Sequence, residues 1–197
     1  MDPTTGTLTY INVTPSINPA YLSIHPNKQW LYSVNELGSK DGKYIGAISA
    51  FRIDLKNKKL QFINSAASCG NSPCYISIDK TGQYAMTANY GNGSVAALPI
   101  GKDGSLGEVT SVIQHQGKGP NIVRQAGPHA HMITQGLESN TIYSVDLGID
   151  EISLYSLDAH GKLTLTGHNM ITKPGAGPRH LAFHPYKPWA YVVNELN

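Results

Sequence analysis

The sequence predicts an all-β fold made of β-propeller blades, each a sheet of four antiparallel strands, with about three and three-quarter blades present. Three observations support this prediction. A motif of two short strands recurs along the chain, no window has a sustained helical period, and 20 Gly and 12 Pro in 197 residues supply many turns. We therefore expect residues 1–197 to form a single partial β-propeller.

The recurring motif opens with a proline before an apolar strand and closes with Asn or Asp at the end of a second strand. The opening prolines stand 54, 55 and 50 residues apart, and the closing residue follows its proline by 16, 16, 18 and 16 residues. A period of about 50 residues is typical of a propeller blade. Blade repeats should open near Pro19, Pro73, Pro128 and Pro178, and the closing residues are Asn35, Asn89, Asp146 and Asn194.

The other strands follow in order along the chain. Leu8–Asn12 matches the fourth strand of a blade whose first three strands are absent. Each of the first three repeats continues with two more strand-like runs, separated by turn signals such as the Asp-Gly pair at residues 103–104. The fourth repeat stops after two strands. The expected third and fourth strands are Ala47–Ile53 and Leu60–Asn64, Ser94–Ile100 and Val109–Ile113, and Glu151–Leu157 and Leu163–Gly167.

A chain that begins and ends within a blade has three arrangements open to it, because a closed propeller usually needs roughly 4–8 full blades. It is a piece of a longer propeller, or two copies complete each other, or it closes as a small strained ring. We expect a piece of a longer propeller. Self-association is the second option, because open blade edges can pair with another chain.

Composition and charge argue against several classes of protein. The formal net charge of +2 at pH 7 gives no clustered basic face, so we expect neither a nucleic-acid nor a membrane partner. The N-terminal residues show no basic-then-apolar leader, which predicts a cytoplasmic location. Cys69 and Cys74 are then expected to be free thiols, with a small disulfide as the alternative. No partner ligands stand near them, so no metal is expected.

Residues that differ from their equivalents in the other repeats are candidates for function. Counted from the opening prolines, His131 falls where the other repeats have Leu or Ile, so packing does not explain it. His129 and Arg179 share a position that is small in the other two repeats. The three sets compared are Leu22, Ile76, His131 and Leu181; Ala20, Cys74, His129 and Arg179; and, after the closing residues, Glu36, Tyr90, Leu147 and Glu195.

Blade geometry should bring these outliers together. The first strand of a blade lines the central channel, and the second strand returns antiparallel to the same face. We therefore expect His129, His131, Arg179 and Glu195 to cluster at one mouth of the channel, where a His, an Arg and a carboxylate form a reasonable hydrolytic set. The alternative is a structural hydrogen-bonded network, because buried ionisable groups often serve only that purpose.

Several motifs resemble the seven-bladed propeller lactonases, a family that includes bacterial 6-phosphogluconolactonases and fungal carboxy-muconate lactonizing enzymes. The resemblance covers nearly the whole chain, which corresponds to roughly the N-terminal half of family members. A further basic residue that the family contributes from a later blade has no counterpart here. The motifs that carry the resemblance are Asn18–Pro26, Leu31–Glu36, Ala88–Val95, Gly127–His131, Val145–Asp150 and Gly175–Pro185.

The resemblance implies a lactonase that needs no cofactor and hydrolyses a sugar-acid lactone, first of all 6-phosphogluconolactone. It implies His131, Arg179 and Glu195 as catalytic residues, and we expect His129, Arg179 and His180 to bind the substrate. A lactone is a cyclic ester, so the residue types suit the chemistry: an arginine for anionic oxygens and a histidine for proton transfer. The alternatives are a non-catalytic scaffold, an inactive partial lactonase and a muconate-type lactonizing cyclase.

Overall fold

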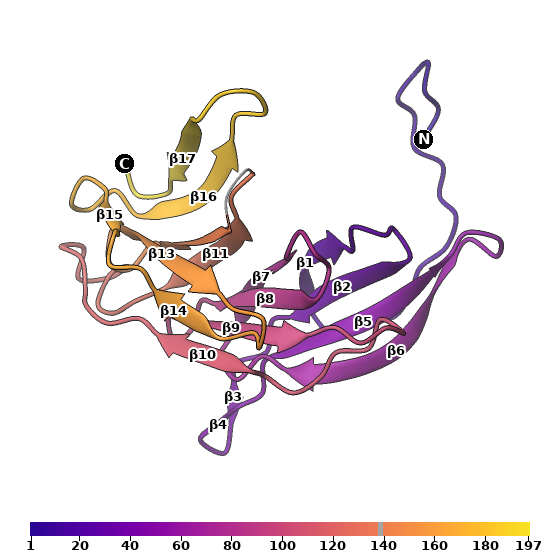
Figure 1. The fold of residues 1–197 in the computed structure, drawn as a ribbon, viewed down its shortest axis with the longest axis horizontal. Coiled ribbons are helices and arrows are strands. Elements are labelled where there is room, and N and C mark those ends of the chain that lie inside the picture. Colours follow the sequence, from indigo (N-terminus) through magenta and orange to yellow (C-terminus); the bar gives the residue numbers. More distant parts are fainter. Residues whose placement is uncertain (138–139) are drawn as a thin grey trace.

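The computed structural model describes residues 1–137 and 140–197, and this part of the chain consists of β-strands and the loops that join them. Two sheets have four antiparallel strands each, a third has the same four-stranded order with one additional short strand, and a fourth blade sheet has two strands. Figure 1 shows them as an open arc, with the two-stranded sheet at one end. The predicted all-β partial propeller is confirmed.

The strands of each blade follow one another outward from the channel. Blade 1 contains β1 (Pro19–Ile24), β2 (Trp30–Asn35), β5 (Ala47–Asp54) and β6 (Lys59–Ala67). Blade 2 contains β7 (Pro73–Ile78), β8 (Tyr84–Asn89), β9 (Ser94–Pro99) and β10 (Ser111–Gln114). Blade 3 contains β11 (Ala130–Gln135), β12 (Thr141–Asp146), β13 (Glu151–Leu157), β14 (Leu163–Leu165) and β15 (Met170–Ile171), and blade 4 contains β16 (Pro178–Phe183) and β17 (Ala190–Asn194).

Two of the predicted strands differ in the structure. Leu8–Asn12 forms no strand, because a fourth strand needs the third strand of its own blade as a hydrogen-bonding partner and the described residues supply none. The expected run Leu163–Gly167 is replaced by two short strands, β14 and β15, which pair with opposite ends of β13.

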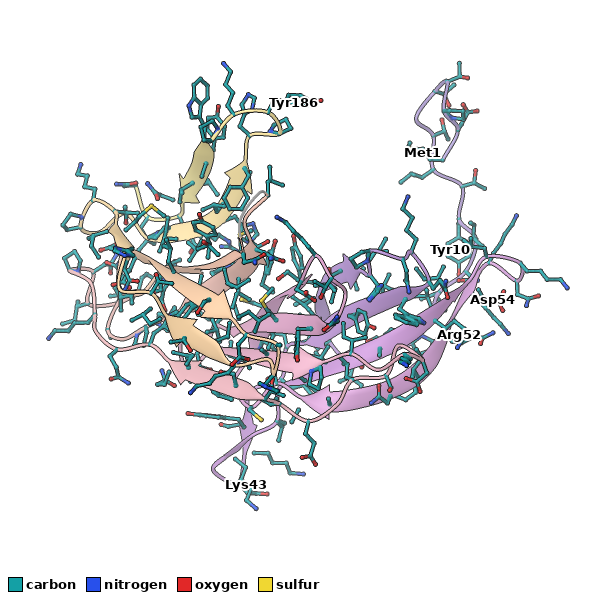
Figure 2. The ribbon with its side chains drawn as sticks, viewed as in Figure 1. Met1, Tyr10, Lys43, Arg52, Asp54 and Tyr186 are labelled. Carbon is teal, nitrogen blue, oxygen red and sulfur yellow. The ribbon has the colours of Figure 1, made fainter. Side chains whose placement is uncertain are left out.

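A small hairpin between β2 and β5 was not predicted. It pairs β3 (Ser39–Lys40) with β4 (Lys43–Tyr44) around Asp41 and Gly42, both of which have positive φ. This Asp-Gly pair is the two-residue turn that β-hairpins favour. Figure 2 shows Lys43 at the tip of this hairpin, which projects away from the blades.

The inner pair of strands in every blade contains a β-bulge near its start. Pro19, Pro73 and Pro178 pair with the closing Asn of their blades, but in blade 3 the residue that pairs with Asp146 is Ala130. The two extra residues of the third repeat therefore precede β11. The interpretation that His131 occupies an apolar packing position was wrong by two residues.

His131 is instead equivalent to the bulge residues of the other blades, one position after the residue that pairs with the closing Asn. These bulge residues are Ala20, Cys74, His131 and Arg179. A bulge leaves its extra residue outside the ladder and redirects its side chain. The same distortion, repeated in four blades, aims these four side chains toward the channel.

Apolar side chains between neighbouring blades form the core. One cluster joins blades 1 and 2 and includes Tyr32, Ile48 and Leu98, and a second joins blades 2, 3 and 4. The outer faces of the end blades stay open, since Leu22 is 55% and Val193 58% exposed. The arc therefore does not close as a small strained ring, and that option is wrong.

No helix long and apolar enough to cross a membrane occurs in the described residues.

Replacing Leu98 tests the packing between blades 1 and 2. Leu98 is fully buried in this core, whereas Leu55, in the β5–β6 turn, is 80% exposed. We expect Leu98→Ala to lower the free energy of unfolding by about 2–5 kcal/mol, because it leaves a cavity, and Leu55→Ala to change it by less than about 0.5 kcal/mol. Urea denaturation measures both variants. Equal losses would contradict the assignment of Leu98 to the core.

Candidate active site

A pocket of about 340 Å³ lies where the inner strands of the four blades meet. Its wall contains the four bulge residues, Ala20, Cys74, His131 and Arg179. The residue that follows the closing Asn contributes a second set, Glu36, Tyr90 and Glu195. Tyr21, Arg124 and His180 complete the lining. The pocket is thus a product of the repeat, with Arg124 as an addition from outside it.

A larger hollow of about 790 Å³ lies on the open face of blade 1. Its lining is mostly apolar, with Asp54, Lys58 and Lys59 as the charged residues, and it contains no histidine or arginine. This hollow lies between the face of blade 1 and the N-terminal segment at residues 11–16. The smaller pocket is the better candidate for chemistry, because ionisable groups converge in it.

The structure brings together His131, Arg179, Glu195 and His180 in this pocket. It does not place His129 among them. The His129 ring stacks on Tyr90 at 4.5 Å between ring centroids, and its Nδ1 lies 2.9 Å from the Tyr90 carbonyl oxygen. His129 precedes β11 by one residue because of the shifted register. It packs against Tyr90, which lines the pocket, and is not itself part of the lining.

Two arginines hold the carboxylate of Glu195. Arg124 donates through Nη2 to Oε1, and Arg179 donates through Nη1 to Oε2. Burial opposes ionisation of Glu195, but the hydrogen bonds from Arg124 and Arg179 outweigh it, and the pKa of this carboxyl lies below its ordinary value. Glu195 is therefore a stable anion that orients both guanidinium groups.

His131 is 7% exposed, and its Nδ1 has no hydrogen-bond partner among the described residues. Tyr90 and His180 meet its ring edge to face, at 5.7 and 5.0 Å between centroids. Burial, followed by the positive charge of Arg179, lowers the pKa of His131 to about 4. His131 is consequently neutral near pH 7, with a free ring nitrogen able to accept a proton.

Cys74 lies in the same wall but is unsuited to nucleophilic chemistry. Its Sγ is 3.5 Å from the carbonyl oxygen of His131, and burial raises the pKa of the thiol to about 12. The reactive form of cysteine is the thiolate, and with its pKa raised by burial the Cys74 thiol stays protonated at neutral pH. Cys74 and Cys69 are both free thiols, as expected.

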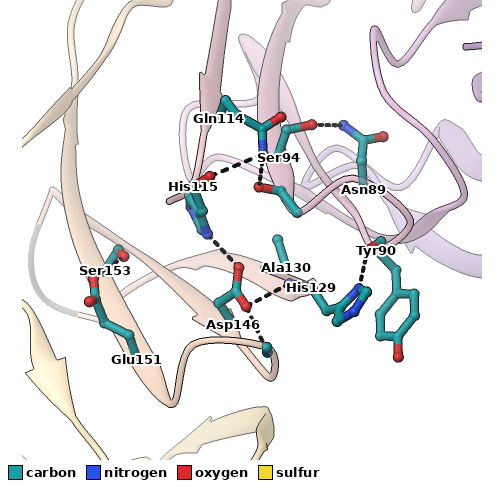
Figure 3. A network of polar contacts seen from close by, with 12 residues as sticks. Asn89, Tyr90, Ser94, Gln114, His115, His129, Ala130, Asp146, Glu151 and Ser153 are labelled. Atoms are coloured by element: carbon teal, nitrogen blue, oxygen red, sulfur yellow. Dashed lines mark hydrogen bonds and ion pairs between the residues drawn. The ribbon is translucent and has the colours of Figure 1, made fainter. Parts of the chain in front are cut away.

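A buried network around Asp146 and His115 fixes the backbone at His129, just before β11 (Figure 3). Asp146 Oδ1 accepts from the backbone N–H groups of His129 at 2.7 Å and Gly148 at 2.8 Å. Its Oδ2 is 2.7 Å from His115 Nδ1, and Tyr155 Oη is 2.8 Å from His115 Nε2. The network ties the end of blade 2 to blade 3 and holds the start of β11 in place.

Sequence reasoning missed Tyr90, Glu36 and Arg124 as members of the site. Glu36 and Tyr90 occupy the same repeat position as Glu195, so the repeat alone carried the signal for them. Arg124 lies in the connection between β10 and β11, outside every repeat position, so the repeat contained no signal that pointed to it. In residues 1–137 and 140–197, no group of three or more His, Cys, Asp or Glu side chains is placed to hold a metal ion.

Four-stranded blades around a charged pocket define a β-propeller with a polar site at its axis. Residues 1–197 match the family described as "Lactonase, 7-bladed beta-propeller", and the chain belongs to this family.

Individual relatives agree with this assignment. The chain is 42% identical to the 6-phosphogluconolactonase of Bacillus subtilis over 180 residues, covering 91% of this chain and 49% of the relative. It is 34% identical to the 6-phosphogluconolactonase of Erwinia tasmaniensis, covering 98% and 53%. The structure of the periplasmic gluconolactonase of Pseudomonas aeruginosa superposes with a TM-score of 0.87 at 30% identity, covering 98% and 56%. The chain spans about half the length of the curated relatives it matches.

An NMR titration of the histidine ring protons tests the environment of His131. We expect its midpoint near pH 4, below the ordinary value of 6.5, and we expect Arg179→Gln to raise the midpoint because a nearby positive charge is removed. Because the pKa of His131 is lower in the folded state than in the unfolded state, the unfolded state takes up the proton first. The contribution of neutral His131 to the free energy of unfolding is therefore complete above pH 6.5 and is lost progressively as the pH falls toward 4. A midpoint near 6.5 in the unmodified chain would show that His131 is not buried as described.

Proposed function

We propose that this chain carries the catalytic pocket of a lactonase that hydrolyses a sugar-acid lactone, with 6-phosphogluconolactone as the first candidate. The observation that carries the proposal is the convergence of His131, Arg179 and Glu195 in one pocket. Membership of the lactonase family supports the reaction class, and the names of the Bacillus and Erwinia relatives support the substrate. The product would be 6-phosphogluconate, an intermediate of the pentose phosphate pathway.

Hydrolysis of a lactone makes three demands on the pocket. A water molecule must lose a proton as it attacks the carbonyl carbon, the resulting oxyanion must be stabilised, and the ring oxygen must receive a proton as its bond to that carbon breaks. These demands call for a proton carrier and for fixed positive charge.

Arg179 meets the demand for fixed positive charge. Its side chain is 45% exposed, and one of its nitrogens is occupied by Glu195. The remaining N–H donors can bind the anionic group of the substrate in the paired geometry that phosphate and carboxylate accept. In an alternative pose the same donors stabilise the oxyanion that develops at the carbonyl.

His131 meets the demand for a proton carrier. As a neutral imidazole it accepts the proton of the attacking water, and the imidazolium that forms returns a proton to the departing ring oxygen. The lowered pKa makes His131 a weak base and makes its protonated form a strong acid. Glu195 takes a positioning role in this scheme, because both of its oxygens bind arginines. His180 contributes to substrate binding from the pocket lining, while His129 acts through Tyr90.

The main rival is a propeller that has no catalytic role, either as a binding scaffold or as an inactive partial lactonase. The unpartnered ring nitrogens of His131 and His180 favour a ligand over a purely structural network. A buried polar atom left without a partner costs about 1–3 kcal/mol, and a bound substrate or water would remove that cost. A muconate-type cyclase would use the same arginine for a carboxylate.

Cytoplasmic location and self-association through the open blade edges are also proposals. A phosphorylated sugar substrate supports the first of these. The exposed apolar side chains on the outer faces of the end blades, among them Leu22 and Val193, support the second.

Hydrolysis of freshly generated 6-phosphogluconolactone, with spontaneous hydrolysis subtracted, tests the proposal. We expect His131→Ala to lower the catalysed rate by about 10²–10⁴-fold, the range that general acid–base catalysis provides. The exposed His160 supplies a matched control, and His160→Ala should leave the rate unchanged. A purified chain no faster than the spontaneous reaction, or a His131→Ala variant as fast as the unmodified chain, would contradict the proposal.

A further inference from the structure

The roles assigned above leave two charged residues of the pocket without a function. Arg124 reaches the pocket from the connection between β10 and β11, and Glu36 reaches it from the end of β2. They come from different blades and carry opposite charges. Their placement gives the pocket a polarity that the catalytic residues alone do not supply.

The loop that carries Arg124 is fastened by its neighbour Gln125, which is fully buried. The Gln125 amide nitrogen donates to the Leu147 carbonyl oxygen and to Asp150 Oδ1, both at 2.8 Å. Gly119 packs so closely on this side chain that an added Cβ would lie 2.4 Å from it. Because this loop is tightly packed and hydrogen-bonded, it holds Arg124 in a defined position, as a binding residue requires.

Arg124 extends the positive side of the pocket. Its Nη2 donates to Glu195, and the same atom is 3.4 Å from Tyr90 Oη. The side chain is 40% exposed, so further N–H donors remain accessible next to those of Arg179. Glu195 bridges the two guanidinium groups and keeps them side by side despite their like charge. Two arginines around one carboxylate leave a net positive charge there.

Glu36 supplies an isolated negative charge in the same pocket. Its backbone is fixed, because its N–H donates to the Asn18 carbonyl oxygen at 2.9 Å and its own carbonyl oxygen accepts from Asn18 Nδ2 at 2.5 Å. The half-buried side chain makes no ion pair or side-chain hydrogen bond among the described residues. A carboxylate on a fixed backbone, with unused acceptor oxygens, suits the hydroxyl groups of a sugar acid.

We propose that Arg124 and Glu36 set the orientation of the substrate, with Arg124 joining Arg179 on the anionic substituent and Glu36 accepting hydrogen bonds from the hydroxyl groups. This inference rests on the proposed function and names the substrate class, a polyhydroxy lactone with one anionic end. Glu36 repels an anionic group, so the reversed orientation is disfavoured. A dicarboxylate of the muconate type would place its second carboxylate toward Glu36 and is disfavoured for the same reason.

Calorimetric titration of the chain with inorganic phosphate and with glucose 6-phosphate, a ring-closed polyhydroxy sugar with one anionic end, tests this inference. We expect Arg124→Gln to weaken the binding of both by on the order of ten-fold, because a charge-assisted contact is lost. We expect Glu36→Ala to weaken the binding of glucose 6-phosphate by several-fold and to leave inorganic phosphate bound as tightly or more tightly, since phosphate has no sugar hydroxyls that Glu36 could bind. Arg124→Lys should restore only part of the affinity, because lysine lacks the planar fork.

Matched controls and a parallel rate measurement separate the outcomes. Arg52→Gln and Glu108→Gln change exposed residues of the same types outside the pocket and should bind both ligands like the unmodified chain. Unchanged phosphate affinity in Arg124→Gln, an equal effect of Glu36→Ala on both ligands, or an unmodified chain that binds neither would overturn the inference. If the unmodified chain nevertheless hydrolyses the lactone, the proposed function stands without the inference. If the expected binding pattern appears without hydrolysis, the orientation stands and the catalytic proposal fails.

Discussion

The antiparallel return of the second strand in each blade is the constraint on which the pocket depends. It places the residue after the closing Asn beside the bulge residue near the start of the first strand, which is how Arg179 and Glu195 come into contact. Repetition of this geometry around the channel brings His131 into the same wall as Arg179. The backbone arrangement is the same in the four blades, and only the side chains at these positions decide whether a blade contributes chemistry or packing.

Much of this arrangement could be predicted from the sequence because the repeat encodes it. The spacing of the opening prolines predicted the positions of the blades. Antiparallel pairing of the first two strands predicted that Arg179 and Glu195 lie close together. Counting from Pro128 put His131 in the wrong register, since a sequence does not reveal on which side of a strand two extra residues lie. Leu8–Asn12 failed for another reason: its apolar alternation is compatible with a strand, but a strand also needs a neighbour.

Arg124 could not have been predicted, because a connection between blades follows no repeat. Its position depends on the burial of Gln125 and on the absence of a side chain at Gly119, which are facts of packing and not of periodicity. Connections of this kind can change in length and charge while the blades that they join keep their hydrogen-bonding ladders. A propeller can therefore alter what its channel accepts without altering how it folds.

The nearness of Arg179 to His131 links ligand binding to proton affinity. The positive charge of Arg179 is one of the causes that hold the pKa of His131 low in the empty pocket. An anion bound to that guanidinium would offset its field at the imidazole and so strengthen His131 as a base. By thermodynamic reciprocity, protonation of His131 would in turn tighten the hold on the anion. The histidine would then be most basic when a substrate is present, and the empty pocket would stay uncharged at this position.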